Sequence, residues 1–291
     1  MTVAAQGYGQ AVPRRARVDS WALLAVPGTI ALVVFFLLPL GLMLIRSLAD
    51  PSPANYLVFT TSDIYVRVLV NTVLISIACT IVCLVLGYPY AYAMHRTGPG
   101  LSLILTAAIL LPFWSSALVR SYAWLVLLRE TGVINSLLLA AGLIASPFKV
   151  VRTETAVIIG MCHILLPFMV FPIYAAMRRI DPNLLPAAAG LGAHPFRAMR
   201  KVFLPLSLPG VYAGSLIVFV VALGFYVVPA LLGGPRSLMF SELIVSKVYD
   251  ELDFGVGAAM AMTLAATTLI SLALVGRFVK FRDAVDYGAA R

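Results

Sequence analysis

The sequence predicts an all-α, polytopic membrane protein with six transmembrane helices. Of its 291 residues, 62% are hydrophobic and only 11% are charged, and the mean hydropathy is +0.99. An ordinary soluble domain carries about 25% charged residues, so this composition excludes a soluble enzyme and a disordered chain. The hydrophobic residues form long uninterrupted runs. Such runs are typical of membrane helices, whereas a β-barrel shows short alternating segments.

Six runs lack Asp, Glu, Lys and Arg, and each exceeds the roughly 20 residues that a helix needs to cross a hydrocarbon core. The third run could continue beyond Arg120 as far as Leu128. The fifth run is too long for one straight crossing, and Gly224 and Pro229 mark places where it could kink or stop. The predicted spans are residues 21–45, 68–94, 97–119, 155–177, 202–235 and 254–276.

Basic residues are distributed unevenly between the two sides of these spans. The side that holds both termini carries 13 Lys or Arg residues, and the other side carries 8. Because cytoplasmic segments are enriched in basic residues, both termini are expected in the cytoplasm. Orientation also explains the net charge of +9 more simply than nucleic-acid binding does. We expect a cytoplasmic tail (1–20), a transmembrane domain (21–280) that includes a cytoplasmic loop (178–205), and a second tail (281–291).

The cytoplasmic loop between the fourth and fifth spans has the pattern of two short helices. Asp181 and Pro182 are typical of a helix start, and Gly190 and Gly192 end the helix that follows. A second helix is expected from Pro195, with an apolar stripe on one face and basic residues elsewhere. A helix–glycine–helix element of this kind suits docking into a groove on another protein.

This loop resembles the EAA loop of permease subunits from ATP-binding-cassette (ABC) importers. The family pattern is Glu-Ala-Ala, three residues, Gly, nine residues, a branched aliphatic residue, one residue, then Leu-Pro. Residues 186–205 keep this spacing, but Pro186 replaces the usual Glu, which removes one polar contact with the ATPase. The resemblance implies that the loop is a coupling helix seated in a partner ATPase. The residues implied in coupling are Pro186, Ala187, Ala188, Gly192, His194 and Arg197.

Four further stretches resemble the first permease of spermidine/putrescine-type importers, and the similarity covers nearly the whole chain beyond the N-terminal tail. The resemblance implies a type I importer permease in the bacterial cytoplasmic (inner) membrane. It would form half of the path for a small organic solute: a polyamine, or a related amine or amino-acid derivative. The stretches are LGYPYAYAM (86–94), LLPFWSSALVRSYAWLVLL (110–128), AVIIGMCHILLPFMVFPIY (156–174) and GFYVVPALLGGP (224–235).

The implied partners are a cytoplasmic ABC ATPase dimer, a second permease that is a paralogue, an external substrate-binding protein and membrane lipid. The chain has no GxxxxGK[ST] phosphate loop, so ATP would be bound by the partner and not by this chain. We therefore expect a transport subunit rather than an enzyme, without a cofactor. The three cysteines, Cys79, Cys83 and Cys162, lie in apolar runs and are expected to be packing residues rather than metal ligands.

Six residues of the membrane spans are candidates for the translocation path. A charge such as Arg120 is costly in a membrane helix and often functional, although snorkelling to the interface is an alternative. For Trp114 or Tyr122 taken singly, an aromatic belt is a better explanation than a path residue. Phe225 and Tyr226 lie in the interrupted fifth span, where a broken helix can line a cavity and where aromatic rings could hold an organic ammonium. The candidates are Trp114, Arg120, Tyr122, Phe225, Tyr226 and Pro229.

Two points leave alternatives open. Related polyamine permeases often carry an acidic residue near the position of Pro229 and Ala230, and this sequence has none there, so a less charged solute stays possible. The alternative function is an ion-coupled secondary transporter. It should show inverted repeats and membrane-embedded ionisable groups, and neither is evident. The importer interpretation alone accounts for the helix–glycine–helix loop.

Overall fold

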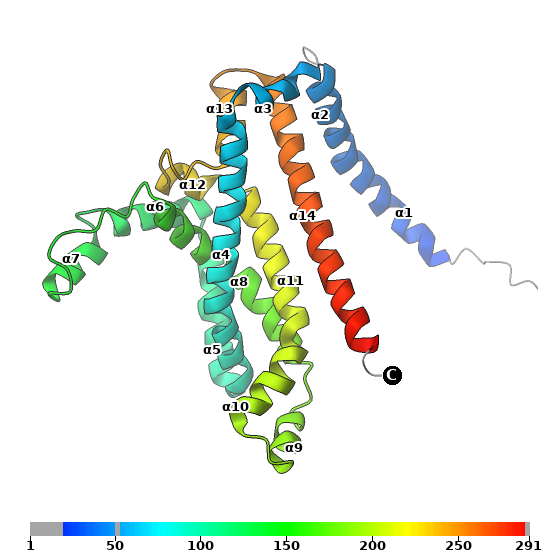
Figure 1. Cartoon of the computed structure of the whole chain (residues 1–291), viewed down its shortest axis with the longest axis vertical. Coiled ribbons are helices and arrows are strands. Elements are labelled where there is room, and N and C mark those ends of the chain that lie inside the picture. Colours follow the sequence, from blue (N-terminus) through cyan, green and yellow to red (C-terminus); the bar gives the residue numbers. More distant parts are fainter. Residues whose placement is uncertain (1–19, 50–52, 289–291) are drawn as a thin grey trace, which may run out of the picture.

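The computed structural model describes residues 20–49 and 53–288, and every regular element in these residues is a helix (Figure 1). Six helical segments are long and apolar enough to cross a membrane, which confirms the predicted fold class. Most of the N-terminal tail predicted for residues 1–20 lies outside the described residues. The six segments are Val26–Ala49, Asp63–Arg96, Ala117–Ala140, Glu154–Met177, Pro195–Leu223 and Phe254–Leu274.

Three helices form the centre of the bundle: α4 (Asp63–Arg96), α8 (Glu154–Met177) and α11 (Leu204–Leu223). Glycines allow them to approach closely. A Cβ added at Gly210 would lie 2.6 Å from the Ala176 Cβ and 2.6 Å from the Pro172 carbonyl oxygen. A Cβ added at Gly214 would likewise lie 2.9 Å from the Met169 carbonyl oxygen. Small residues at helix contacts are the usual solution in membranes, where close van der Waals packing replaces the hydrophobic effect.

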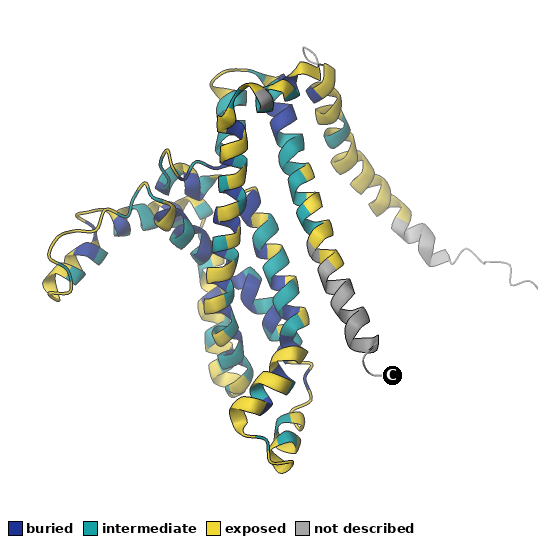
Figure 2. Ribbon diagram, in the orientation of Figure 1, coloured by how far each residue is buried: buried dark blue, intermediate teal, exposed yellow. Residues whose placement is uncertain are grey.

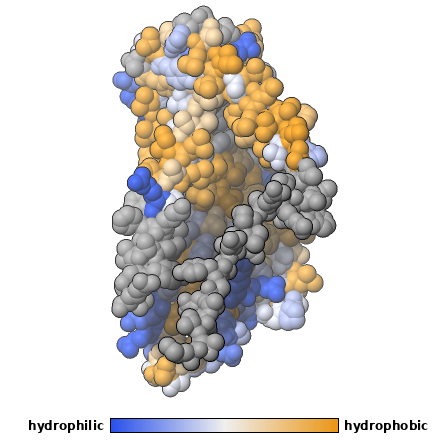
Figure 3. Space-filling view, turned by 90° about the vertical axis from the view of Figure 1, so that its right-hand side faces the viewer, coloured by the Kyte–Doolittle hydropathy of each residue, from blue (hydrophilic) through white to orange (hydrophobic). Residues whose placement is uncertain are grey.

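Burial follows this arrangement (Figure 2). Buried residues are concentrated along α4, α8 and α11, whereas most residues of the first helical segment between Val26 and Ala49 are exposed. On the face shown in Figure 3, hydrophobic side chains dominate the upper and central part, and hydrophilic ones gather toward the lower end. This exposed apolar surface is expected for helices that face lipid or a second membrane subunit.

The first span stands apart from the central helices. It consists of α1 (Ser20–Leu32), a π-helical turn η1 (Val33–Leu37) and α2 (Leu38–Ala49). The last helix, α14 (Phe254–Gly288), packs against α2, and the Arg46 guanidinium carbon lies 4.9 Å from the centre of the Phe254 ring. Helix α14 continues beyond residue 280, where we expected a tail to begin.

The third span, predicted at residues 97–119, is not one straight helix, and the third candidate span of the structure is instead Ala117–Ala140. Helix α5 (Pro99–Leu110) and a 3-10 turn η3 (Leu111–Trp114) end at Ser115. The Ser116 hydroxyl then accepts a hydrogen bond from the Leu118 amide at 3.1 Å and begins α6 (Ala117–Leu128). A serine side chain that bonds to a nearby backbone amide favours the start of a new helix over the continuation of the previous one. The break between η3 and α6 therefore has a local cause. A short helix, α7 (Val133–Ala140), follows and projects sideways from the bundle (Figure 1).

The fifth span is interrupted, as the sequence predicted. Helix α11 ends at Leu223, and α12 (Val227–Leu232) ends before Gly233. A Cβ at Gly233 would lie 2.4 Å from the Pro229 carbonyl oxygen, so only glycine fits at this turn. Helix α13 (Phe240–Tyr249) completes the segment before α14. The shorter elements η2 (Pro53–Leu57) and α3 (Val58–Thr61) join the first span to α4.

Candidate functional site

The loop between α8 and α11 lies at one end of the molecule (Figure 1). Asp181 precedes its first helix, α9 (Leu184–Gly190), and its carboxylate accepts a hydrogen bond from the Asn183 amide at 2.9 Å. Gly192 then adopts a φ of +83°, in the left-handed region, although nothing lies within 4 Å of its added Cβ. The backbone conformation, and not a lack of space, therefore calls for glycine at this position.

The second helix of the loop, α10 (Pro195–Ala198), begins at a histidine cap. The His194 Nδ1 atom accepts a hydrogen bond from the Phe196 amide at 3.3 Å. His194, which we expected to contact the ATPase, therefore also has a local structural role. Helix α10, a π-helical turn η4 (Met199–Phe203) and α11 form a continuous helical segment, so the expected end at Leu204 and Pro205 does not occur.

The apolar stripe predicted on this second helix is split between two environments. Phe203 is buried, and its ring lies 5.4 Å from the rings of both Tyr92 and His95 on α4. Phe196 instead points away from the bundle and is 70% exposed, and Leu191 between the two helices is 90% exposed. The loop therefore presents two large apolar side chains outward, and sequence reasoning missed the role of Leu191.

All six residues predicted for coupling lie together on this loop, because α9 and α10 pack against each other. Pro186, Ala187 and Arg197 are exposed, and Ala188 is half-buried. Pro186 lies in the first turn of α9, where a backbone amide has no partner within the helix. A proline is therefore tolerated at this position, where the resemblance implies a glutamate.

Within the membrane-spanning part, one cluster contains buried nitrogen atoms without hydrogen-bond partners. Among the described residues these atoms are Nε and Nη1 of Arg120 and Nδ1 of His163. The Arg120 guanidinium carbon lies 5.7 Å from the centre of the Phe113 ring, and the Trp124 and His163 rings meet edge to face at 5.7 Å. A buried donor without a hydrogen-bond partner costs about 1–3 kcal/mol.

The other five path candidates belong to three elements: Trp114 lies in η3, Tyr122 lies in α6, and Phe225, Tyr226 and Pro229 lie in or just before α12. Trp114 is 91% exposed and Tyr122 is also exposed. Phe225 packs against the core, and its carbonyl oxygen accepts a hydrogen bond from the Ser241 hydroxyl at 2.6 Å. Tyr226 is 40% exposed at the start of α12, whereas the neighbouring Pro229 is buried. Helix α12 packs against α6, so Tyr122 of α6 and the candidates in and before α12 lie on adjacent elements.

A separate apolar cavity of about 350 Å³ lies between α4, α11 and α14. Its walls include Ile77, Thr80 and Ile81 of α4, Phe219 of α11 and Leu274 of α14. None of the six predicted path residues lines this cavity. Its walls come from helices far apart in the sequence, so no local pattern could have indicated it.

The three cysteines form a compact cluster between α4 and α8. Their sulfur atoms lie within 4.8 Å of one another, and the Cys79 and Cys162 sulfurs are 3.5 Å apart. Cys162 donates to the Cys79 carbonyl oxygen at 3.6 Å, and Cys83 donates to the Cys162 carbonyl oxygen at 3.9 Å. These thiols are buried and already have acceptors, which supports the predicted role in packing. The sequence placed Cys79 and Cys83 on one helix face but could not place Cys162 beside them.

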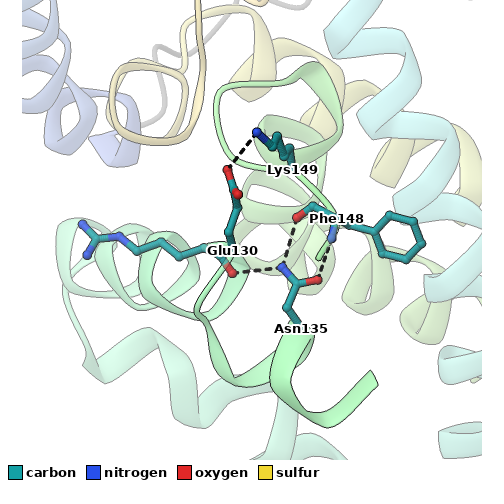
Figure 4. A network of polar contacts seen from close by, with 5 residues as sticks. Glu130, Asn135, Phe148 and Lys149 are labelled. Carbon is teal, nitrogen blue, oxygen red and sulfur yellow. Dashed lines mark hydrogen bonds and ion pairs between the residues drawn. The ribbon is translucent and has the colours of Figure 1, made fainter. Parts of the chain in front are cut away.

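On the side of the bundle, a polar network joins the two ends of the segment around α7 (Figure 1 and Figure 4). The buried Asn135 amide nitrogen donates to the carbonyl oxygens of Arg129 and Phe148, both at 3.0 Å, and its oxygen accepts from the Phe148 amide at 2.9 Å. The Lys149 ammonium lies 3.7 Å from the Glu130 carboxylate. This segment is therefore an ordered part of the surface.

Helix α13, at the end of the molecule opposite α9, carries two further charged contacts (Figure 1). The Glu242 carboxylate accepts a hydrogen bond from the Met239 amide at 2.8 Å. Burial raises the pKa of Glu242, and this hydrogen bond opposes the rise in part. Lys247 forms an ion pair with Glu251, and their hydrogen bond raises the pKa of Lys247.

Comparisons with known proteins agree with this architecture. Residues 98–282 match the family model described as "Binding-protein-dependent transport system inner membrane component". The spermidine/putrescine transport system permease protein PotB of Haemophilus influenzae is 35% identical over 260 residues, which cover 86% of this chain and 89% of that protein. PotB of Escherichia coli is 34% identical over 242 residues, which cover 80% and 88% of the two chains.

The crystal structure of a bacterial ABC transporter involved in the import of alginate contains a chain with a similar fold. The TM-score is 0.71 and the sequence identity is 18%, and the superposition covers 89% of this chain and 95% of that chain. At this identity the likeness concerns the fold alone.

Proposed function

This chain belongs to the family of binding-protein-dependent transport system inner membrane components, and from that premise we propose that it forms half of the translocation path for a small organic amine. It is a multi-pass inner-membrane permease subunit of an ABC importer and carries no catalytic site of its own. Family membership sets aside the alternative of an ion-coupled secondary transporter.

The solute that we propose is a polyamine, such as spermidine or putrescine, or a related amine or amino-acid derivative. The PotB relatives support an amine. The partly exposed ring of Tyr226 at the start of α12 supports it as well, because aromatic faces attract organic ammonium groups. The lack of an acidic residue near Pro229 and Ala230 favours a solute with fewer charges than spermidine.

We propose that both termini face the cytoplasm and that the partners are an ATPase dimer, a paralogous second permease and an external binding protein. ATP bound by the ATPases would close them, and this closure would move the α9–α10 loop. The loop would then tilt the attached helices and open the path toward the outside, which is a rigid-body form of alternating access.

The observation that carries this proposal is the pair of exposed apolar side chains on the α9–α10 loop. Leu191 and Phe196 protrude from a polar end of the molecule, where exposed arginines surround them. Large apolar side chains at such a place mark a protein interface, because their exposure to water is costly.

Affinity purification of the assembled importer tests the proposal. The variant with Leu191→Asp and Phe196→Asp should lose the ATPase, because two carboxylates replace the apolar contacts, while the second permease is retained. Leu143→Asp is the matched control, since Leu143 is also exposed but lies just after α7, away from the α9–α10 loop. A double variant that keeps the ATPase at the wild-type ratio would show that the loop does not hold it.

A further inference from the structure

Two adjoining cavities open at the end of the bundle opposite α9. They have volumes of about 540 Å³ and 460 Å³ and share Glu154, Pro235 and Arg236 in their walls. Arg152 lines the first cavity and Arg67 lines the second. The two cavities form one continuous surface, which we call the arginine groove and define by Arg67, Arg152, Arg236 and Glu154.

The charge of the arginine groove is not balanced within the chain. Three arginines and one glutamate line it, and none of these arginines makes an ion pair with a described residue. Two lysines on the same side of the membrane spans are paired: Lys149 lies 3.7 Å from Glu130, and Lys247 pairs with Glu251. The groove therefore carries more positive than negative charge.

The backbone that carries these arginines is held in a fixed and strained conformation. Arg152 has a φ of +66°, in the left-handed region, and its amide donates to the Leu232 carbonyl oxygen at 2.8 Å. A Cβ at Gly234 would lie 2.5 Å from the Arg152 carbonyl oxygen, so the two segments touch directly. Strain of this kind persists only where the surrounding structure imposes it, and it is concentrated at functional sites.

Arg236 is positioned by a second set of contacts. The Asn71 side-chain amide donates to the carbonyl oxygens of Arg236 and Leu238, at 3.2 Å and 3.0 Å. The start of α4, the start of α8 and the loop between α12 and α13 are thus joined, and each contributes one arginine. An exposed lysine or arginine on a mobile loop would have no such support.

We propose that the arginine groove is the docking surface for an acidic segment of the external binding protein. Guanidinium groups match carboxylates in geometry and can bind them through two parallel hydrogen bonds. The Glu154 carboxylate repels other carboxylates. Acidic groups of the partner can therefore bind beside the arginines, but the partner needs a basic or neutral group next to Glu154 at the start of α8. This inference rests on the proposed function, because it supposes that a binding protein delivers the solute at this end.

The direct test uses the complete importer, reconstituted in lipid nanodiscs, and the binding protein of the same transport system. The variant with Arg152→Glu and Arg236→Glu should weaken binding at least about tenfold at low salt, mainly through slower association. The loss should shrink at about 0.5 M NaCl, because salt screens the charges. The variant with Arg152→Gln and Arg236→Gln should show an intermediate loss of affinity for the binding protein. It replaces the double Glu variant in the test if that variant does not fold.

The control is Lys149→Glu, which reverses one basic charge near the groove but outside its walls, half the charge change of the double variant, and it should leave the affinity unchanged. A wild-type affinity in the double Glu variant would overturn the docking proposal, while ATPase co-purification would show that the proposed function still holds. A photo-reactive residue in place of Thr155, which lines the groove, gives a second readout. A cross-link to the binding protein supports the proposal, and cross-links only to phospholipid or to the second permease contradict it.

Discussion

Gly210 sets how closely α8 and α11 approach each other. Its missing side chain leaves room for the Pro172 carbonyl oxygen and the Ala176 Cβ, at distances that no real Cβ would tolerate. The sequence shows only a glycine in an apolar run, so the need for it appears once the facing helix is known. The same holds for Cys162, whose neighbours Cys79 and Cys83 come from another helix.

Gly210→Ala should therefore destabilise the protein by about 1–3 kcal/mol, because the neighbouring atoms belong largely to the backbone and cannot move aside. Gly100→Ala is the matched control, since nothing lies within 4 Å of a Cβ at Gly100. Thermal unfolding of the purified importer in detergent measures both. Equal melting temperatures for the two variants would contradict this account of the α8–α11 contact.

Tyr226 is the residue through which the proposed path is best tested. Its ring is partly exposed, and loss of a cation–π contact weakens binding by about 0.5–2 kcal/mol. Tyr226→Ala should lower the apparent affinity for labelled putrescine roughly 2- to 30-fold in a transport assay, with the ATPase still bound. Tyr249→Ala, at the exposed end of α13, should have no effect. Unchanged putrescine uptake by an assembled Tyr226→Ala importer would remove Tyr226 from the path.

At the scale of elements, the sequence predicted six helical spans correctly, because long apolar runs are local signals. It placed the third span at residues 97–119, whereas the third candidate span of the structure is Ala117–Ala140. The interruption of the fifth span follows from Gly224 and Gly233, which are visible in the sequence. The break at Ser116 in the third span was missed, because a serine inside an apolar run also fits a continuous helix. The split of the apolar stripe at Phe196 and Phe203 was missed too, since it depends on the position of α4.

Helix α13 gives a prediction for pH dependence. The pKa of Glu242 is raised by burial, so the folded protein binds this proton more tightly than the unfolded chain does. The protonated carboxyl favours folding at low pH, and this contribution is lost as the pH rises through the raised pKa. Glu242→Gln keeps an acceptor for the Met239 amide and lacks the charge. Its melting temperature should therefore exceed that of the wild type by more at pH 8 than at pH 5.

A difference in melting temperature that stays constant between pH 5 and pH 8 would contradict this account of Glu242. Glu251→Gln is the control, because it makes the same substitution at an exposed position just after α13. It removes the ion pair with Lys247 on the surface, and exposed pairs contribute only about 0–1 kcal/mol.

At the scale of the whole molecule, the two ends of the bundle have different chemistry. One end presents Leu191 and Phe196 on the α9–α10 loop, and the other presents the arginine groove. Composition and charge asymmetry predicted which loop lies at which end. They could not predict the groove, because its three arginines lie far apart in the sequence and meet only in the folded chain. More than eighty residues separate Arg67 from Arg152, and more than eighty separate Arg152 from Arg236.

The central claim is that the α9–α10 loop transmits the nucleotide cycle of an ATPase to the membrane helices. Leu191→Cys tests it, because Leu191 is 90% exposed whereas all three native cysteines are buried. In the assembled importer, this cysteine should resist a membrane-impermeant maleimide and should cross-link to the ATPase with a yield that changes when ATP is added. A cysteine at 191 that reacts equally fast with and without the ATPase, and forms no cross-link, would contradict the claim.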